Sequence, residues 1–217
     1  MTVLAIAHRA GNSLAGLHGA AALGVDVIEC DVHEFRGRLE VRHLKTAGPL
    51  PFLWDRWELA SASAPRLGLR ELLDADRHGT TFMLDLKTRN TDAARSLARL
   101  LHELGNDRQV LVCGRYWPSV DVLSGLPFVR PVLSARNRVE LGRLRQRLGT
   151  GDRVHGASVH RSLLDTALVE DLLRHVDVVM TWPVNDRAAL DAVLALGVNG
   201  VISDDHDVLA ALVALRE

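Results

Sequence analysis

Short apolar runs alternate along the chain with longer segments in which apolar residues recur every three or four positions. The longer segments carry stripes such as Leu97, Leu101 and Leu104, which are typical of the buried face of a helix. The apolar runs have the length of single strands, and they are Val3–Ala7, Val25–Val32, Thr81–Leu86, Gln109–Cys113, Val129–Leu133, Val154–Val159, Val176–Trp182 and Val198–Ser203. Strands and helices that alternate in this way predict a parallel sheet with helical crossovers.

The number of runs favours an eight-fold β/α barrel over an open sheet. A (β/α)8 barrel, or TIM barrel, needs about 200 residues at minimum, and the chain has 217. The rival is a doubly wound open sheet, which usually carries a glycine-rich turn after its first strand. Here the first strand runs into His8-Arg9-Ala10-Gly11-Asn12, which is not that motif. We therefore expect one compact (β/α)8 barrel domain over residues 1–217.

One segment, from His43 to about Leu67, interrupts the alternation. It holds three prolines and the tryptophans Trp54 and Trp57, and it shows neither strand nor helix period. Loops of this length are usually functional or mobile. We expect an irregular, short insertion after the second strand, placed over the face of the barrel where active sites are built.

Composition excludes several classes of protein. The 26 basic residues nearly balance 27 acidic ones, and no basic run is present, so neither nucleic acid nor an anionic membrane is an expected partner. No apolar stretch has the length of a membrane span, and the N-terminus lacks the pattern of a signal peptide. We expect a cytoplasmic protein without stable membrane insertion, in which Cys30 and Cys113 are buried free thiols. The sequence indicates no particular oligomeric state.

Carboxylates gather at the downstream ends of two predicted strands. Side chains alternate along a strand, so Glu29 and Asp31 share one face, as do Asp85 and Lys87 on the next strand. Carboxylates at such positions are costly to bury unless they are paired or bind a metal. Oxygen ligands favour one divalent cation, Mg²⁺ or Ca²⁺ with Mn²⁺ as a third candidate, over Zn²⁺.

Basic and imidazole groups accompany these carboxylates. His8 and Arg9 end the first strand, and His43 follows the second. Each residue taken singly has a structural explanation, such as a hydrogen-bonded core histidine or a carboxylate paired with arginine. Together they fit one site in which the cation and basic groups hold a phosphate and two imidazoles transfer protons. His160 also follows a strand at the appropriate end.

The ordered combination of these motifs resembles the glycerophosphodiester phosphodiesterases, a family of metal-dependent barrels. That family has His-Arg at its first strand, Gly-x-Asp-x-Ile-Glu-x-Asp-Val at its second, a following His, and Glu-x-Lys at its third. The matching segments are His8-Arg9, Gly24–Val32, His43 and Asp85-Leu86-Lys87. Two C-terminal motifs also match, at Trp182–Asn185 and Leu196–Asp204. The resemblance therefore spans nearly the whole chain.

The resemblance implies a role for each of these residues. Glu29, Asp31 and Asp85 would ligate the metal, and Arg9 and Lys87 would bind the phosphate. His8 and His43 would serve as the general acid and base. The substrate would be a small glycerophosphodiester, cleaved to glycerol 3-phosphate and an alcohol. Trp182 would wall the pocket, or would simply be an aromatic residue of the barrel core.

The sequence departs from the family pattern at several points. Leu44 replaces the Asp that usually follows the hairpin His, Asp85 replaces Glu, and Pro183 replaces Thr. Two alternatives stay open beside hydrolysis of soluble diesters. One is a phospholipase-D-like enzyme on lysophospholipids, which would use an apolar approach near Trp54 and Trp57. The other is a barrel that binds a phosphorylated ligand without turnover.

Overall fold

The apolar runs form a closed parallel barrel. A computed structural model describes residues 2–46, 50–55, 58–105, 108–151 and 154–216. Within these ranges the ring consists, in order, of β1 (Leu4–Ala7), β2 (Val27–Phe35), β7 (Thr81–Leu86), β8 (Val110–Gly114), β9 (Val129–Ala135), β10 (Gly156–His160), β11 (Val178–Trp182) and β12 (Gly200–Ser203). The ring closes because β1 pairs in parallel with both β12 and β2. The predicted (β/α)8 barrel is confirmed, and the doubly wound alternative is wrong.

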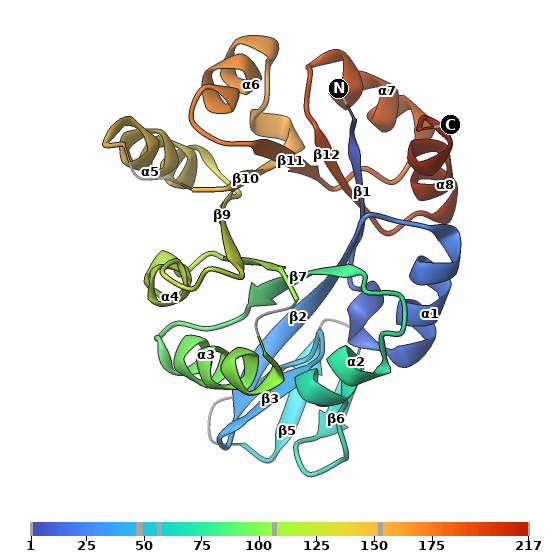
Figure 1. Cartoon of the computed structure of the whole chain (residues 1–217), viewed down its shortest axis with the longest axis vertical. Coiled ribbons are helices and arrows are strands. Elements are labelled where there is room, and N and C mark those ends of the chain that lie inside the picture. The colour runs from blue at the N-terminus through green and yellow to red at the C-terminus, as the bar shows by residue number, and fades with distance from the viewer. Residues whose placement is uncertain (1, 47–49, 56–57, 106–107, 152–153, 217) are drawn as a thin grey trace.

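Helices surround the strands (Figure 1). Those described are α1 (Leu14–Leu23), α2 (Leu69–Ala75), α3 (Asp92–Leu104), α4 (Trp117–Leu123), α5 (Arg138–Gly149), α6 (Thr166–Leu173), α7 (Arg187–Ala195) and α8 (His206–Ala214), with two 3₁₀ turns at Ala10–Asn12 and Arg161–Leu163. The side chains of Asp165, Asp186 and Asp205 accept backbone N–H groups and so cap α6, α7 and α8. In the described part of the chain, no helix has the length and apolar character needed to cross a bilayer.

The alternation of side chains along β2 divides the apolar residues into two clusters. Ile28, Cys30 and Val32 pack toward the helices, whereas Val27 belongs to a smaller cluster inside the barrel. Cys113 lies in the inner cluster, and both cysteines are buried free thiols as predicted. The parity that places Val27 inside also turns Glu29 and Asp31 toward the barrel axis.

The segment after β2 is more regular than the sequence indicates. Strand β3 (Arg38–Val41) forms an antiparallel hairpin with β2, and the next strands, β4 (Lys45–Thr46), β5 (Phe52–Asp55) and β6 (Glu58–Ser61), form a separate antiparallel sheet. The expectation of an irregular segment is therefore wrong, although the insertion itself is confirmed. Its strands are two to four residues long, too short for a period to be recognised. Trp57 lies outside the described residues.

Candidate active site

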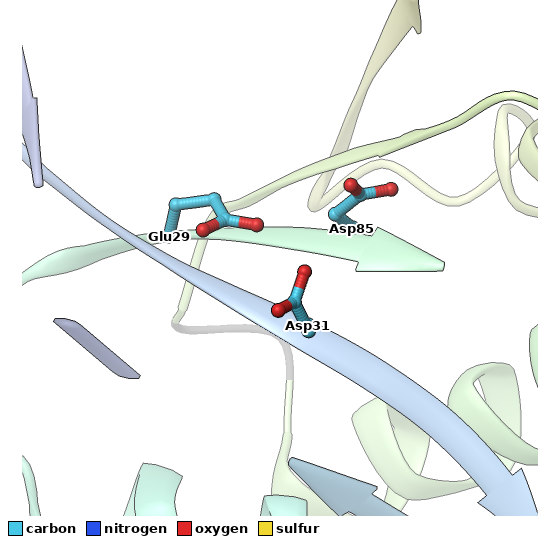
Figure 2. Close-up of side chains that lie close together, drawn as sticks. All are labelled: Glu29, Asp31 and Asp85. Carbon is cyan, nitrogen blue, oxygen red and sulfur yellow. The ribbon is translucent and has the colours of Figure 1, made fainter. Parts of the chain in front are cut away.

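Three carboxylates converge at the mouth of the barrel (Figure 2). Glu29 and Asp31 project from β2, and Asp85 on β7 is the register partner of Asp31. One oxygen from each lies within 4.8 Å of the others. Glu29 and Asp31 are buried, and Asp85 is partly buried. The sequence-based expectation that these side chains come together is confirmed.

The turn after β1 brings backbone and amide groups to the carboxylates. Arg9 has a left-handed backbone (φ 55°), a conformation that costs energy for a residue with a side chain and concentrates at functional sites. In this conformation its N–H donates to Glu29 Oε2 at 2.6 Å. Asn12 Nδ2 donates to Asp31 Oδ2 at 3.0 Å, and Asn12 Oδ1 accepts the N–H of Asp31 at 2.8 Å. The turn therefore fixes both β2 carboxylates.

Gly11 allows this turn to lie directly on β2. A Cβ atom at this position would lie 2.7 Å from the Cβ of Cys30 and 3.2 Å from the carbonyl oxygen of Glu29. Both neighbours are rigid parts of the strand, so any larger residue would force the turn outward. The missing side chain is what brings Asn12 within hydrogen-bonding distance of Asp31.

His8 is oriented by a carboxylate outside the triad. Its Nδ1 lies 2.8 Å from Asp204 Oδ1, which leaves Nε2 facing the site, 4.0 Å from Glu29 Oε2. Asn185 holds Asp204 in turn, accepting its backbone N–H at 3.0 Å. Burial disfavours the charged imidazole, but the Asp204 hydrogen bond and the Glu29 charge outweigh it and raise the pKa of His8.

His43 contacts a different carboxylate of the triad. Its Nδ1 lies 3.2 Å from Asp31 Oδ2, and its Nε2 lies 2.8 Å from Asp55 Oδ2 at the end of β5. The two histidines that the sequence singles out are thus brought to one site, beside different members of the triad. The ring of His43 is about a third exposed (35%), so substrate can reach it.

Lys87 and Arg9 supply positive charge to the triad. Lys87 Nζ contacts Asp85 and lies 2.7 Å from Asp31 Oδ1, while Arg9 Nε lies 3.4 Å from Asp31 Oδ2. Burial alone would raise the pKa of Asp31, but the Lys87 ammonium, with help from Asn12 and Arg9, lowers it to about 2. Burial opposes the charge of Lys87, yet Asp85 and Asp31 raise its pKa. Asp31 is therefore ionised at neutral pH.

Glu29 shows why the site fits a cation. Burial, followed by the charge of neighbouring Asp31, raises the pKa of Glu29 to about 7. Carboxylates at this spacing repel one another, and a divalent cation among them removes that penalty. An all-oxygen donor set of this kind suits Mg²⁺ or Ca²⁺. The residues present therefore fit a divalent metal, which Glu29, Asp31 and Asp85 would hold.

Trp182 and His160 lie on neighbouring strands at the same end of the barrel. They are register partners on β11 and β10, and their rings meet edge to face with centroids 5.0 Å apart. Trp182 is half-buried and packs on the cluster inside the barrel. His160 Nδ1 is occupied by Ser162 at 2.8 Å. Trp182 thus packs on the inner cluster, and its role as a pocket wall stays a prediction.

Four polar residues of the site have no role that the sequence predicts. Asn12 was visible only as a polar residue after His-Arg, while Asn185 and Asp204 lay within recognised C-terminal motifs. Each contacts a group named above. Asp55 lies in the insertion, where no sequence motif marked it. Its position became clear only from the pairing of the small sheet.

Comparison with known proteins finds one family match, near the C-terminus. Residues 178–207 match the model of the glycerophosphoryl diester phosphodiesterase family. No curated protein matches the chain significantly.

Solved structures share the whole fold at low sequence identity. A phosphodiesterase from Oleispira antarctica, solved in complex with the product sn-glycerol-3-phosphate, has a TM-score of 0.77 at 17% identity, covering 99% of this chain and 97% of that one. A glycerophosphodiester phosphodiesterase from Parabacteroides distasonis has a TM-score of 0.73 at 19% identity, covering 100% and 99%. One from Agrobacterium tumefaciens has a TM-score of 0.72 at 18% identity, covering 99% and 100%. The family match and the shared fold together confirm the resemblance to the glycerophosphodiester phosphodiesterases that the sequence motifs predict.

Proposed function

We propose that this chain is a metal-dependent phosphodiesterase that hydrolyses glycerophosphodiesters to glycerol 3-phosphate and an alcohol. The observation that carries the proposal is the convergence of Glu29, Asp31 and Asp85 at the barrel mouth, with one histidine beside Glu29 and another beside Asp31. A divalent cation held by the three carboxylates would supply electrostatic stabilisation of the charge that develops on the phosphate. Arg9 and Lys87, which lie beside the triad, bind the remaining phosphate oxygens.

His8 and His43 form an acid–base pair. A hydroxyl of the glycerol next to the phosphate attacks phosphorus, and one histidine takes its proton. The bond between phosphorus and the alcohol oxygen then breaks, and the other histidine donates a proton to the departing oxygen. A water molecule opens the resulting cyclic phosphate with the two roles exchanged. The placement of the rings beside different carboxylates supports this division, since each can serve a different oxygen of the phosphate.

The product is inferred from the reaction proposed above and from one solved structure of similar fold. The Oleispira antarctica phosphodiesterase holds sn-glycerol-3-phosphate, and its fold matches this chain over nearly its full length. We infer the same product here, released in the cytoplasm from small diesters such as those of choline, ethanolamine or glycerol. The compact insertion supports small substrates, because it offers few residues to enclose a large head group.

One observation favours a second candidate, a phospholipase-D-like activity on lysophospholipids. Leu50, Trp54 and Leu59 expose large apolar side chains on the insertion, and Trp54 pairs with Leu59 across β5 and β6. The same small sheet carries Asp55, which contacts His43. The acyl chain of a lysophospholipid could therefore lie on the outer face of this sheet while its phosphate reaches the triad.

The test is turnover under controlled metal. The protein is stripped with EDTA, incubated with glycerophosphocholine, and assayed for glycerol 3-phosphate after addition of Mg²⁺, Ca²⁺ or Mn²⁺. We expect no turnover without metal and recovery with Mg²⁺ or Ca²⁺. Binding of glycerol 3-phosphate with no turnover under any metal would instead identify a non-catalytic barrel.

A further inference from the structure

We propose that Asp55 is a positioning residue for His43, which holds the imidazole ring in place beside the triad. This inference rests on the proposed function, in which His43 transfers a proton. Asp55 Oδ2 lies 2.8 Å from His43 Nε2; Asp55 ends β5, and His43 lies in the link between β3 and β4. Leu44, which follows His43, is a buried apolar residue and offers no such carboxylate.

The small sheet determines where Asp55 points. Side chains alternate along β5, so Leu53 and Asp55 share one face while Trp54 faces the other way. Leu53 is fully buried and Trp54 is exposed, which fixes the orientation of the strand. Turning Asp55 away from His43 would expose Leu53. Burial of one leucine side chain stabilises by about 1.5–3 kcal/mol, so the direction of Asp55 is well determined.

Strand β4 ties this sheet to the segment that carries His43. Lys45 and Thr46 pair with Trp54 and Leu53, so the residues just after His43 are hydrogen-bonded to the strand that carries Asp55. Lys45 Nζ also lies 3.8 Å from Asp55 Oδ1 and balances its charge. The strand that begins two residues after His43 is therefore paired with the strand that ends at Asp55.

Arg42 fixes the backbone on both sides of His43. This side chain is buried, an unusual location for a guanidinium. It donates to the carbonyl of Leu44, to Thr46 Oγ1 at 3.3 Å and to Glu40 Oε2 at 3.1 Å. The backbone N–H of Arg42 also donates to the carbonyl of Asp31 at 3.0 Å. The main freedom left to His43 is rotation of its ring, which the Asp55 contact restricts.

The contact also determines how the ring is oriented. A carboxylate only accepts hydrogen bonds, so the bond to Asp55 requires a proton on Nε2. Nδ1 is then directed to the triad, 3.2 Å from Asp31 Oδ2. His8 has the opposite arrangement, since Asp204 binds its Nδ1 and its Nε2 faces the triad. Each histidine is thus oriented by a carboxylate outside the metal site.

The experiment combines kinetics with a variant matched in charge and location. Asp55→Ala should lower kcat about 10- to 100-fold, the range for loss of an outer partner of a functional histidine, with KM nearly unchanged. Glu58→Ala is the control, because Glu58 is the exposed register partner of Asp55 on β6. It removes the same charge from the same sheet and should leave kcat unchanged. In a His43→Ala background, Asp55→Ala should have no further effect.

Two kinetic results would overturn the proposal. One is a decrease of kcat in Glu58→Ala as large as that in Asp55→Ala. The other is a decrease of kcat by Asp55→Ala that is equally large in the His43→Ala background. A readout independent of turnover is ¹H–¹⁵N NMR of the wild-type His43 ring. We expect a proton bonded to Nε2 whose signal changes in Asp55→Ala, and its absence would refute the positioning role. If wild-type protein hydrolyses no glycerophosphodiester but shows this signal, the proposed reaction fails while the positioning contact stands.

Discussion

The close packing of Gly11 on β2 leads to a quantitative prediction. In Gly11→Ala the new methyl carbon would lie 2.7 Å from Cys30 Cβ and 3.2 Å from a backbone oxygen, so the turn must move away from the strand. Forcing an extra methyl group into a packed site costs about 1–3 kcal/mol. For a chain of this size each kcal/mol lowers Tm by about 2–4 °C, so we expect Tm to fall by roughly 2–12 °C.

The same shift should weaken the metal site. Moving the turn lengthens the hydrogen bonds between Asn12 and Asp31, now 2.8 and 3.0 Å, and outer partners of metal ligands typically contribute 10- to 100-fold to affinity. Thermal unfolding followed by circular dichroism measures the first effect, and calorimetric titration with Mg²⁺ or Ca²⁺ measures the second.

Gly19→Ala is the matched control. Gly19 is exposed within α1, and no atom lies within 4 Å of the position its Cβ would take. Replacing a glycine inside a helix by alanine stabilises by about 0.5–1 kcal/mol. A Gly11→Ala variant as stable as wild type, or a Gly19→Ala variant that loses as much stability, would refute the packing argument.

Three further predictions concern chemistry. His8→Ala and His43→Ala should each lower kcat for glycerol 3-phosphate release by roughly 10²- to 10⁴-fold. The control, His160→Ala, should have a much smaller effect. Wild-type turnover in the His8 or the His43 variant would remove that histidine from the mechanism. Asp85→Ala should weaken the binding of divalent cations measured by calorimetry, and Asp85→Glu should alter the preference among these cations. Full affinity in the alanine variant would mean that Glu29 and Asp31 suffice to hold the metal. In competition under matched metal, glycerophosphocholine should have the higher kcat/KM, whereas a clear excess for lysophosphatidylcholine would favour the lysolipid alternative.

The barrel and its triad were predictable because both follow from local pattern. The alternation of Glu29 with its apolar neighbours fixes its face, and β2 and β7 are neighbouring parallel strands whose downstream ends lie together. Those two rules place Asp31 and Asp85 at the same end of the barrel, and the register of the two strands sets them opposite each other. The roles of the individual residues remain predictions, since they depend on chemistry that strand parity does not determine.

The partners of the histidines were not predictable in this way. Asp55 lies on a strand of four residues in an insertion rich in proline, and its contact with His43 depends on a sheet without a recognisable period. Asp204 meets His8 across 196 positions of sequence. Both contacts depend on tertiary pairing, so the sequence shows the residues but not their association.

The pairing of His8 with Asp204 links the chemistry to the order of folding. His8 follows the first strand of the ring and Asp204 follows β12, the strand that closes it. Contacts of such long sequence separation form late, because the entropy of closing the intervening loop must be overcome first. During synthesis, β12 leaves the ribosome after all the other barrel strands. We therefore expect a nascent chain that lacks β12 to contain the whole triad and yet remain inactive until ring closure orients His8.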